Sequence, residues 1–146
     1  MTDVRKRQFK SGDTIYVVDY WGTKDGTQAF KAYAKILEVD EENEVFVALL
    51  YGDTYITYSF EDYGRLIFDT AKEAVEAAEK LPKPTTTVYQ IIGQKVYQKE
   101  ILGINGRYNG KAFDLVFNFN KGESVSIKEL GSTVFLSRSE AREHKK

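Results

Sequence analysis

SFEDYGRLIFDTAKEA, residues 59–74, and SIKELGSTVFLSRSEA, residues 126–141, carry one pattern twice, at an offset of 67 residues and without a gap. Apolar residues recur even where identity is lost, as at Ile67 and Val134. The identical positions are Ser59 with Ser126, Gly64 with Gly131, Phe68 with Phe135, Glu73 with Glu140 and Ala74 with Ala141. Self-similarity of this kind indicates a duplicated structural unit. It predicts a strand, a turn, a second strand and a helix start in each copy, with Phe68 and Phe135 buried in equivalent places.

Each copy closes with the start signal of a helix. Thr70 and Glu73 form a capping box, in which the hydroxyl accepts from a backbone N–H of the first turn and the glutamate reaches back to the cap residue. Ser137 and Glu140 repeat this signal near the C-terminus. The first pattern predicts a helix over about residues 70–81, because two prolines follow it. The second helix is expected to be short.

Both halves of the chain also contain runs of β-branched and aromatic residues upstream of the repeated motif, which predict strands. In the first half these are residues 15–20, 29–39, 44–51 and 55–60. In the second half they are residues 88–97, 99–104, 112–120 and 124–130. Because glycine and asparagine tolerate positive φ, tight turns are predicted between these runs. The turns are expected around Gly22 and Gly26 and at the dipeptides Asn105-Gly106 and Asn109-Gly110.

The two halves match in the order of their parts. Thr14–Val18 resembles Thr87–Ile91, Lys35–Val39 resembles Glu100–Ile104, and Val45–Leu50 falls opposite Phe113–Phe117. The sequence therefore predicts a mainly β fold with two short helices, built as two tandem antiparallel units of the half-barrel kind found in SH3-like modules, each ending in a capped helix. The expected organisation is a basic N-terminal tail over residues 1–12, a first unit over 13–81, a linker over 82–86 and a second unit over 87–146.

Composition restricts the class of partner. The chain has 146 residues, of which 42% are hydrophobic and 14% aromatic, enough to build a core. Its formal net charge of −1 creates no general positive field, so nucleic acid is not expected as a principal partner. The basic residues before residue 11 are interpreted as a solvated tail. No apolar run is long enough for a signal peptide or a membrane span, so a cytoplasmic protein without a membrane partner is expected.

Few residue types for catalysis are present. The chain lacks cysteine, and its one histidine, His144, lies in a lysine-rich tail. The lack of cysteine excludes cysteine-bound metals and Cys-His nucleophile pairs, and a histidine in a frayed tail lacks the orienting neighbours that a Ser-His pair requires. The acidic residues 40–42 are expected to form a turn that points into water, and the glycine-rich stretch 103–110 is interpreted as a hairpin loop. We therefore expect a protein that is not an enzyme and uses no cofactor or metal.

LGSTVFLSRSEA, residues 130–141, resembles a motif in short uncharacterised proteins of Gram-positive bacteria and their prophages, which often end in G-x-T-V-F-L-T-x-E-E-A. VYQIIGQKVYQKEILGI, residues 88–104, is similar to the opening of the same module. The resemblance implies a phage or mobile-element setting. Small phage proteins without an enzyme signature often inhibit a host protein by occupying its surface, and CRISPR effectors and other defence proteins are among their targets.

Aromatic residues supply the candidate binding site. Tyrosine and tryptophan at the rim of a sheet make good interface anchors, because they bury a large area at a small entropic cost. The candidates at predicted strand ends or turns are Tyr20, Trp21, Tyr51, Tyr55, Tyr63 and Tyr108. The leading hypothesis is a protein-binding regulator or inhibitor of a host protein. The alternative is a binder that sequesters a small molecule, such as a nucleotide or metabolite, between its two units. The sequence leaves the oligomeric state open.

Overall fold

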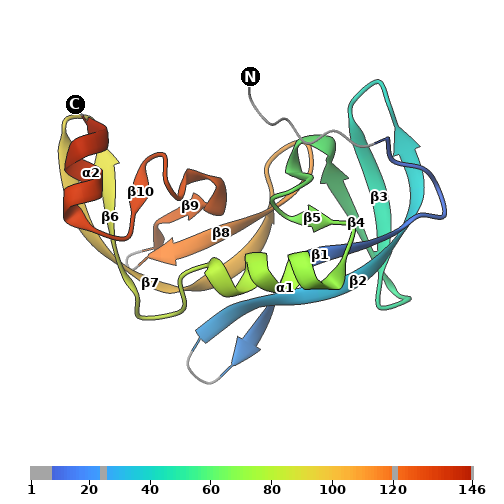
Figure 1. Ribbon diagram of the computed structural model, residues 1–146, viewed down its shortest axis with the longest axis horizontal. Coiled ribbons are helices and arrows are strands. Elements are labelled where there is room, and N and C mark those ends of the chain that lie inside the picture. Colours follow the sequence, from blue (N-terminus) through green and yellow to red (C-terminus); the bar gives the residue numbers. More distant parts are fainter. Residues whose placement is uncertain (1–7, 24–25, 120–121, 146) are drawn as a thin grey trace. The chain divides into compact units, whose positions relative to one another are not determined.

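A computed structural model describes residues 8–23, 26–119 and 122–145, with the backbone alone at residues 20–23, 26–30 and 145 (Figure 1). The chain divides into two compact units. Unit 1 contains Met1–Asp19, Ala29–Leu81 and Arg107–Asp114. Unit 2 contains Tyr20–Gln28, Pro82–Gly106 and Leu115–Lys146. The prediction of a mainly β fold with two short helices is confirmed.

The first repeat forms a five-stranded antiparallel sheet and one helix. Its elements are β1 (Thr14–Thr23), β2 (Gly26–Asp40), β3 (Val45–Leu50), β4 (Thr54–Ser59), a 3-10 turn η1 (Phe60–Asp62), β5 (Ile67–Phe68) and α1 (Ala71–Lys80). The strand order is β4-β3-β2-β1-β5, so the chain returns after η1 to pair β5 with β1. A register shift between Ile36 and Glu38 marks a bulge in the long strand β2.

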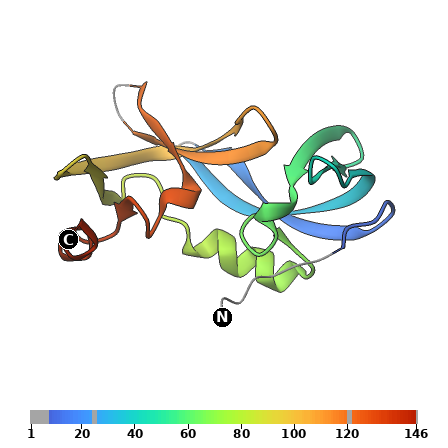
Figure 2. The same ribbon diagram turned by 90° about the horizontal axis from the view of Figure 1, so that it is seen from above.

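The second repeat has the same arrangement. Its elements are β6 (Thr87–Ile92), β7 (Lys95–Tyr108), β8 (Phe113–Phe119), β9 (Ser124–Ser126), η3 (Ile127–Glu129), β10 (Val134–Phe135) and α2 (Arg138–Lys145). The strand order β10-β6-β7-β8-β9 is that of the first sheet with each strand replaced by its counterpart. The final helix α2 lies against β6 and β10 (Figure 2).

The repeated motif keeps its hydrogen bonds as well as its elements. Gly64 donates through its backbone N–H to the carbonyl of Ile67 over 2.8 Å, and Gly131 donates to Val134 over 2.7 Å. Both glycines have a φ near +90°, a conformation that costs glycine little. Phe68 pairs with Tyr16 across β1, Phe135 pairs with Tyr89 across β6, and both phenylalanines are buried. The predicted structural repeat is therefore confirmed.

The helix caps are also confirmed. The Thr70 hydroxyl accepts from the backbone N–H of Glu73 over 3.2 Å, and the Ser137 hydroxyl accepts from that of Glu140 over the same distance. Each hydroxyl in turn donates to the glutamate side chain of its box, at 3.1 and 3.0 Å. The buried faces of the two helices share Ala74 and its counterpart Ala141.

Several predicted turns and strand boundaries differ from the structure, each near a glycine. β1 continues through Gly22 to Thr23 and β2 begins at Gly26, so Gly22 lies in a strand, and residues 24–25 of the expected turn are outside the described residues. The break in the second half falls at Gly93, where φ is 63°, so β6 ends at Ile92 and β7 begins at Lys95. Asn105-Gly106 lies within β7, which also replaces most of the expected loop over residues 103–110. Asn109-Gly110 does form a turn, in which the Asn109 side chain accepts from two backbone N–H groups.

Ordered packing also extends into segments expected to be solvated. Phe9 falls in the predicted tail, yet its ring is buried and its centroid lies 4.8 Å from that of Phe46. Pro82 falls in the predicted linker and is buried as well. The sequence register places Pro82 in the second repeat where Phe9 stands in the first. Both repeats therefore bury an apolar residue at this position.

Candidate functional site

The structure separates the six predicted aromatic residues. Tyr20 and Trp21 lie on the backbone of β1 instead of a loop, and their side chains are outside the described residues. Tyr63 is half-buried, and its hydroxyl is hydrogen bonded to Asp69. Its ring stands edge-on to Phe9, with 5.8 Å between centroids. Tyr63 is thus a packing residue of the first repeat and does not belong to an open surface.

The other three predicted residues form what we call the tyrosine patch: Tyr51, Tyr55 and Tyr108, all in unit 1. Their exposed fractions are 58%, 68% and 58%. Tyr51 follows β3 directly in the hairpin turn, and Tyr55 lies opposite Leu49 on β4. Tyr108 is the last residue of β7. These three exposed tyrosines therefore come from the β3–β4 and β7–β8 hairpins.

Two rings of the tyrosine patch are held by their hydroxyl groups. The Tyr51 hydroxyl donates to the carboxylate of Asp19 over 3.0 Å. Desolvation, together with the negative charge of Asp19, raises the pKa of Tyr51 to about 12. The Tyr108 hydroxyl accepts from the backbone N–H of Thr57 over 3.2 Å. Both rings are consequently fixed in orientation while more than half of each stays exposed.

The contact from Tyr108 also protects an open sheet edge. β4 is the outer strand of the first sheet, and its outward backbone groups could pair with another chain. The Tyr108 hydroxyl occupies one of those groups, at Thr57. Next to it, the Phe113 ring meets the Tyr58 ring edge-on, with 5.7 Å between centroids. The tip of the β7–β8 hairpin is therefore anchored on β4 by one hydrogen bond and one ring contact.

Tyr58 is a buried residue of β4, on the face of the strand opposite to that of Tyr55. Its side chain is fully buried, and its hydroxyl has no hydrogen-bond partner among the described residues. Burial raises the pKa of Tyr58 well above its ordinary value, and the nearby Asp19 raises it further. Asp19 lies on β1 and Tyr58 on β4, so this proximity of a buried hydroxyl to a carboxylate joins residues far apart in the sequence.

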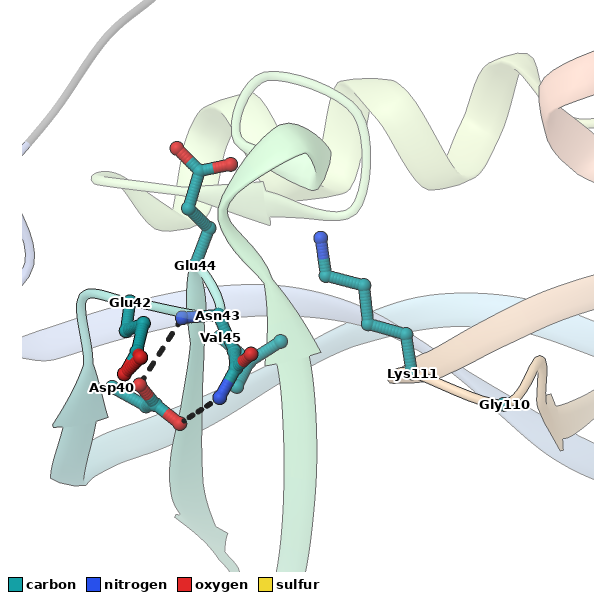
Figure 3. A pocket seen from close by; sticks show the side chains of 7 residues that line it. All are labelled: Asp40, Glu42, Asn43, Glu44, Val45, Gly110 and Lys111. Atoms are coloured by element: carbon teal, nitrogen blue, oxygen red, sulfur yellow. Dashed lines mark hydrogen bonds between the residues drawn. The ribbon is translucent and has the colours of Figure 1, made fainter.

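A second feature of unit 1 is an acidic hollow of about 540 Å³ between two turns (Figure 3). It is lined by Asp40, Glu42, Asn43, Glu44, Val45, Gly110 and Lys111. Asp40 accepts from the side-chain amide of Asn43 over 2.8 Å and from its backbone N–H over 3.2 Å. These bonds lower the pKa of Asp40, whereas a general acid needs a raised one. Asp40 therefore organises the turn, as expected of an exposed Asx motif.

The described residues form neither a metal site nor a membrane-spanning helix. No group of three or more His, Asp or Glu side chains there is arranged to hold a metal ion. His144 is exposed on α2, with its ring centroid 5.1 Å from that of Phe135. No helix in the described part of the chain combines the length and the apolar character that spanning a membrane requires.

Comparison with known proteins adds no relative. No protein-family model matches the chain, and no curated protein has a sequence significantly similar to it.

Proposed function

We propose that the protein is a non-catalytic, protein-binding regulator, and that the tyrosine patch of unit 1 is its contact surface. The observation that carries this proposal is the exposure of three tyrosines, two of which are already fixed through their hydroxyl groups. Exposed aromatic area placed on a folded sheet suits a protein partner. An adjustable ring would lose rotamer freedom on binding, whereas the fixed rings of Tyr51 and Tyr108 lose little.

The finer identity of the fold is part of the same proposal. We propose that each repeat is an SH3-like half-barrel. Five antiparallel strands with a 3-10 turn between the fourth and the fifth support this assignment in both repeats. The tyrosine patch lies on two hairpins of the present chain.

The biological setting is proposed from the sequence. The resemblance of residues 130–141 to proteins of Gram-positive bacteria and their prophages supports a phage or mobile-element inhibitor that acts on a host protein in the cytoplasm. Host defence proteins are the class of target that this setting favours. Inhibition by occupying a surface requires no catalytic group of the inhibitor.

The proposal is tested by affinity capture from a host lysate with matched tyrosine variants. The wild-type protein should retain one host protein in stoichiometric amount. Tyr51→Ala combined with Tyr55→Ala should weaken binding of that protein about 30-fold or more, the usual effect of removing interface hot spots. Tyr33→Ala is the control, because Tyr33 is 53% exposed but lies outside the patch. Equal binding by the double variant and the control, with folding intact by circular dichroism, would exclude the patch as the contact surface.

A further inference from the structure

Unit 2 contains a cationic hollow of about 300 Å³. It is lined by Gln94, Lys95, Val96, Tyr97, Arg138 and Arg142. Three of these side chains carry a positive charge, and no carboxylate is among the described residues that line the hollow. The hollow therefore concentrates positive charge in a chain whose formal net charge is −1. Local potential of this kind selects a negatively charged ligand.

Arg138 is oriented in the hollow by neutral partners. Its guanidinium lies 4.9 Å from the centroid of the Tyr89 ring, and it donates to the side-chain oxygen of Gln98 over 3.3 Å. Both contacts restrict the side chain without neutralising its charge. Arg138 is also the first residue of α2, where the helix dipole disfavours a cation. Its charge therefore does not serve the stability of the helix, whereas it adds to the attraction of the helix N-terminus for an anion.

The two helices differ in charge at two equivalent positions. Arg138 and Arg142 are one helical turn apart on α2, so they project from one face. The equivalent positions of α1 are occupied by Ala71 and Val75. The frame around these positions is unchanged, because the caps and the buried alanines correspond. At these two positions α2 therefore carries arginines where α1 carries apolar residues, within a helix that is capped in the same way.

We infer that the cationic hollow binds a carboxylate-rich segment of a partner protein, an inference that rests on the proposed protein-binding function. Cations from one strand and from two turns of a helix are spread along the hollow, which suits a row of carboxylates better than a single phosphate. Tyr97, 42% exposed, lines the hollow, and Ile92, 49% exposed, lies opposite Lys95 on β6. This apolar rim suits a peptide, and the negative net charge of the chain disfavours an extended nucleic acid.

The test measures binding of a fluorescein-labelled peptide of alternating glutamate and glycine to the full chain by fluorescence anisotropy. Arg138→Gln combined with Arg142→Gln should raise the dissociation constant about tenfold or more, since both charged partners are removed. Arg142→Gln alone should have a smaller effect in the same direction, and it disturbs neither contact of Arg138. Lys72→Gln combined with Lys80→Gln removes the same charge from exposed positions of α1 and should leave the dissociation constant unchanged.

Three results would overturn the inference. The first is absence of peptide binding by the wild type, and the second is an equal loss in the α1 control. The third is displacement of the peptide by inorganic phosphate or oligothymidylate at a lower concentration than by unlabelled glutamate peptide, which would assign the hollow to a phosphate-bearing ligand. The assay contains no host protein. Failure of the tyrosine patch in the capture experiment and failure of the cationic hollow here are therefore separate outcomes.

Discussion

Thr85 holds a backbone conformation that glycine holds in the other repeat. Its φ is 74°, and that of the equivalent Gly12 is 95°. Both residues donate through their backbone N–H over 2.7 Å, Gly12 to Ile36 and Thr85 to Ile101. A positive φ is unfavourable for a β-branched residue, by about 1–2 kcal/mol. The exposed Thr85 side chain does not offset this cost with buried contacts.

Thr85→Gly is therefore expected to stabilise the protein by about 0.5–1 kcal/mol, after subtracting the entropy that glycine gains in the unfolded chain. Urea denaturation with a constant m-value measures the change. Thr85→Ala keeps the Cβ atom and should gain much less. A glycine variant no more stable than the alanine variant would show that the backbone at this position is not strained.

Removing the hydroxyl group of Tyr58 and that of Tyr63 should change the free energy of unfolding in different directions. The buried Tyr58 hydroxyl has no partner in the described part of the chain, so Tyr58→Phe should be neutral or stabilise by about 1 kcal/mol. The Tyr63 hydroxyl is bonded to Asp69, so Tyr63→Phe should destabilise by about 1 kcal/mol. Denaturation midpoints of the two variants decide the question. A loss of stability in Tyr58→Phe would reveal a partner for this hydroxyl.

Tyr51 predicts a specific alkaline sensitivity. Its pKa is raised from 10.0 to about 12 by desolvation and by Asp19. Between these values the unfolded chain releases the Tyr51 proton while the folded chain keeps it. The stabilisation is therefore complete below pH 10 and is lost as pH rises towards about 12. Urea denaturation at a series of pH values should show a weaker loss of stability in Tyr51→Phe than in the wild type over this interval. Parallel curves would contradict the interaction with Asp19.

The two capped helices allow one hydrogen bond to be compared in two contexts. Thr70 caps α1, which has 10 residues, and Ser137 caps α2, which has 8. Each hydroxyl satisfies one N–H of the first turn, so Thr70→Ala and Ser137→Ala should each cost about 1 kcal/mol. Thr70→Ser is the control and should retain most of the stability. Thermal or urea unfolding measures the stability of each variant. An unchanged midpoint in either alanine variant would show that the corresponding hydroxyl does not stabilise its helix.

The repeated elements were predictable because their signals are local. The capping boxes, the glycine at the bend and the phenylalanine of the short strand each specify their neighbours within a few residues. The extent of the long strands could not be predicted from local signals. Gly22 and Gly106 favour a turn by residue type, but strand pairing along β1 and β7 overrides this preference. The contact of Tyr51 with Asp19 joins residues 32 positions apart, and no pattern in the sequence encodes it. The residue type and position of the patch tyrosines marked them as candidates in the sequence, but the hydrogen bonds that hold Tyr51 and Tyr108 could not be predicted from it.

Four strands link the two units through the continuous backbone. β1 passes from unit 1 to unit 2 after Asp19, and β2 returns at Ala29. β7 enters unit 1 at Arg107, and β8 returns to unit 2 at Leu115. Each of these strands therefore has one part in unit 1 and one part in unit 2. Unfolding of either unit should therefore withdraw strand residues from both.

This continuity predicts a single unfolding transition for the whole molecule. Phe68→Ala, a large truncation in the core of unit 1, should cost about 3–5 kcal/mol. The loss should appear equally in far-ultraviolet circular dichroism and in the fluorescence of Trp21, which lies in a segment of unit 2. Phe135→Ala, the matched truncation in unit 2, should shift both signals in the same way. If Phe68→Ala lowered the midpoint by circular dichroism but left the tryptophan transition in place, the two units would unfold independently and the shared strands would transmit no stability between them.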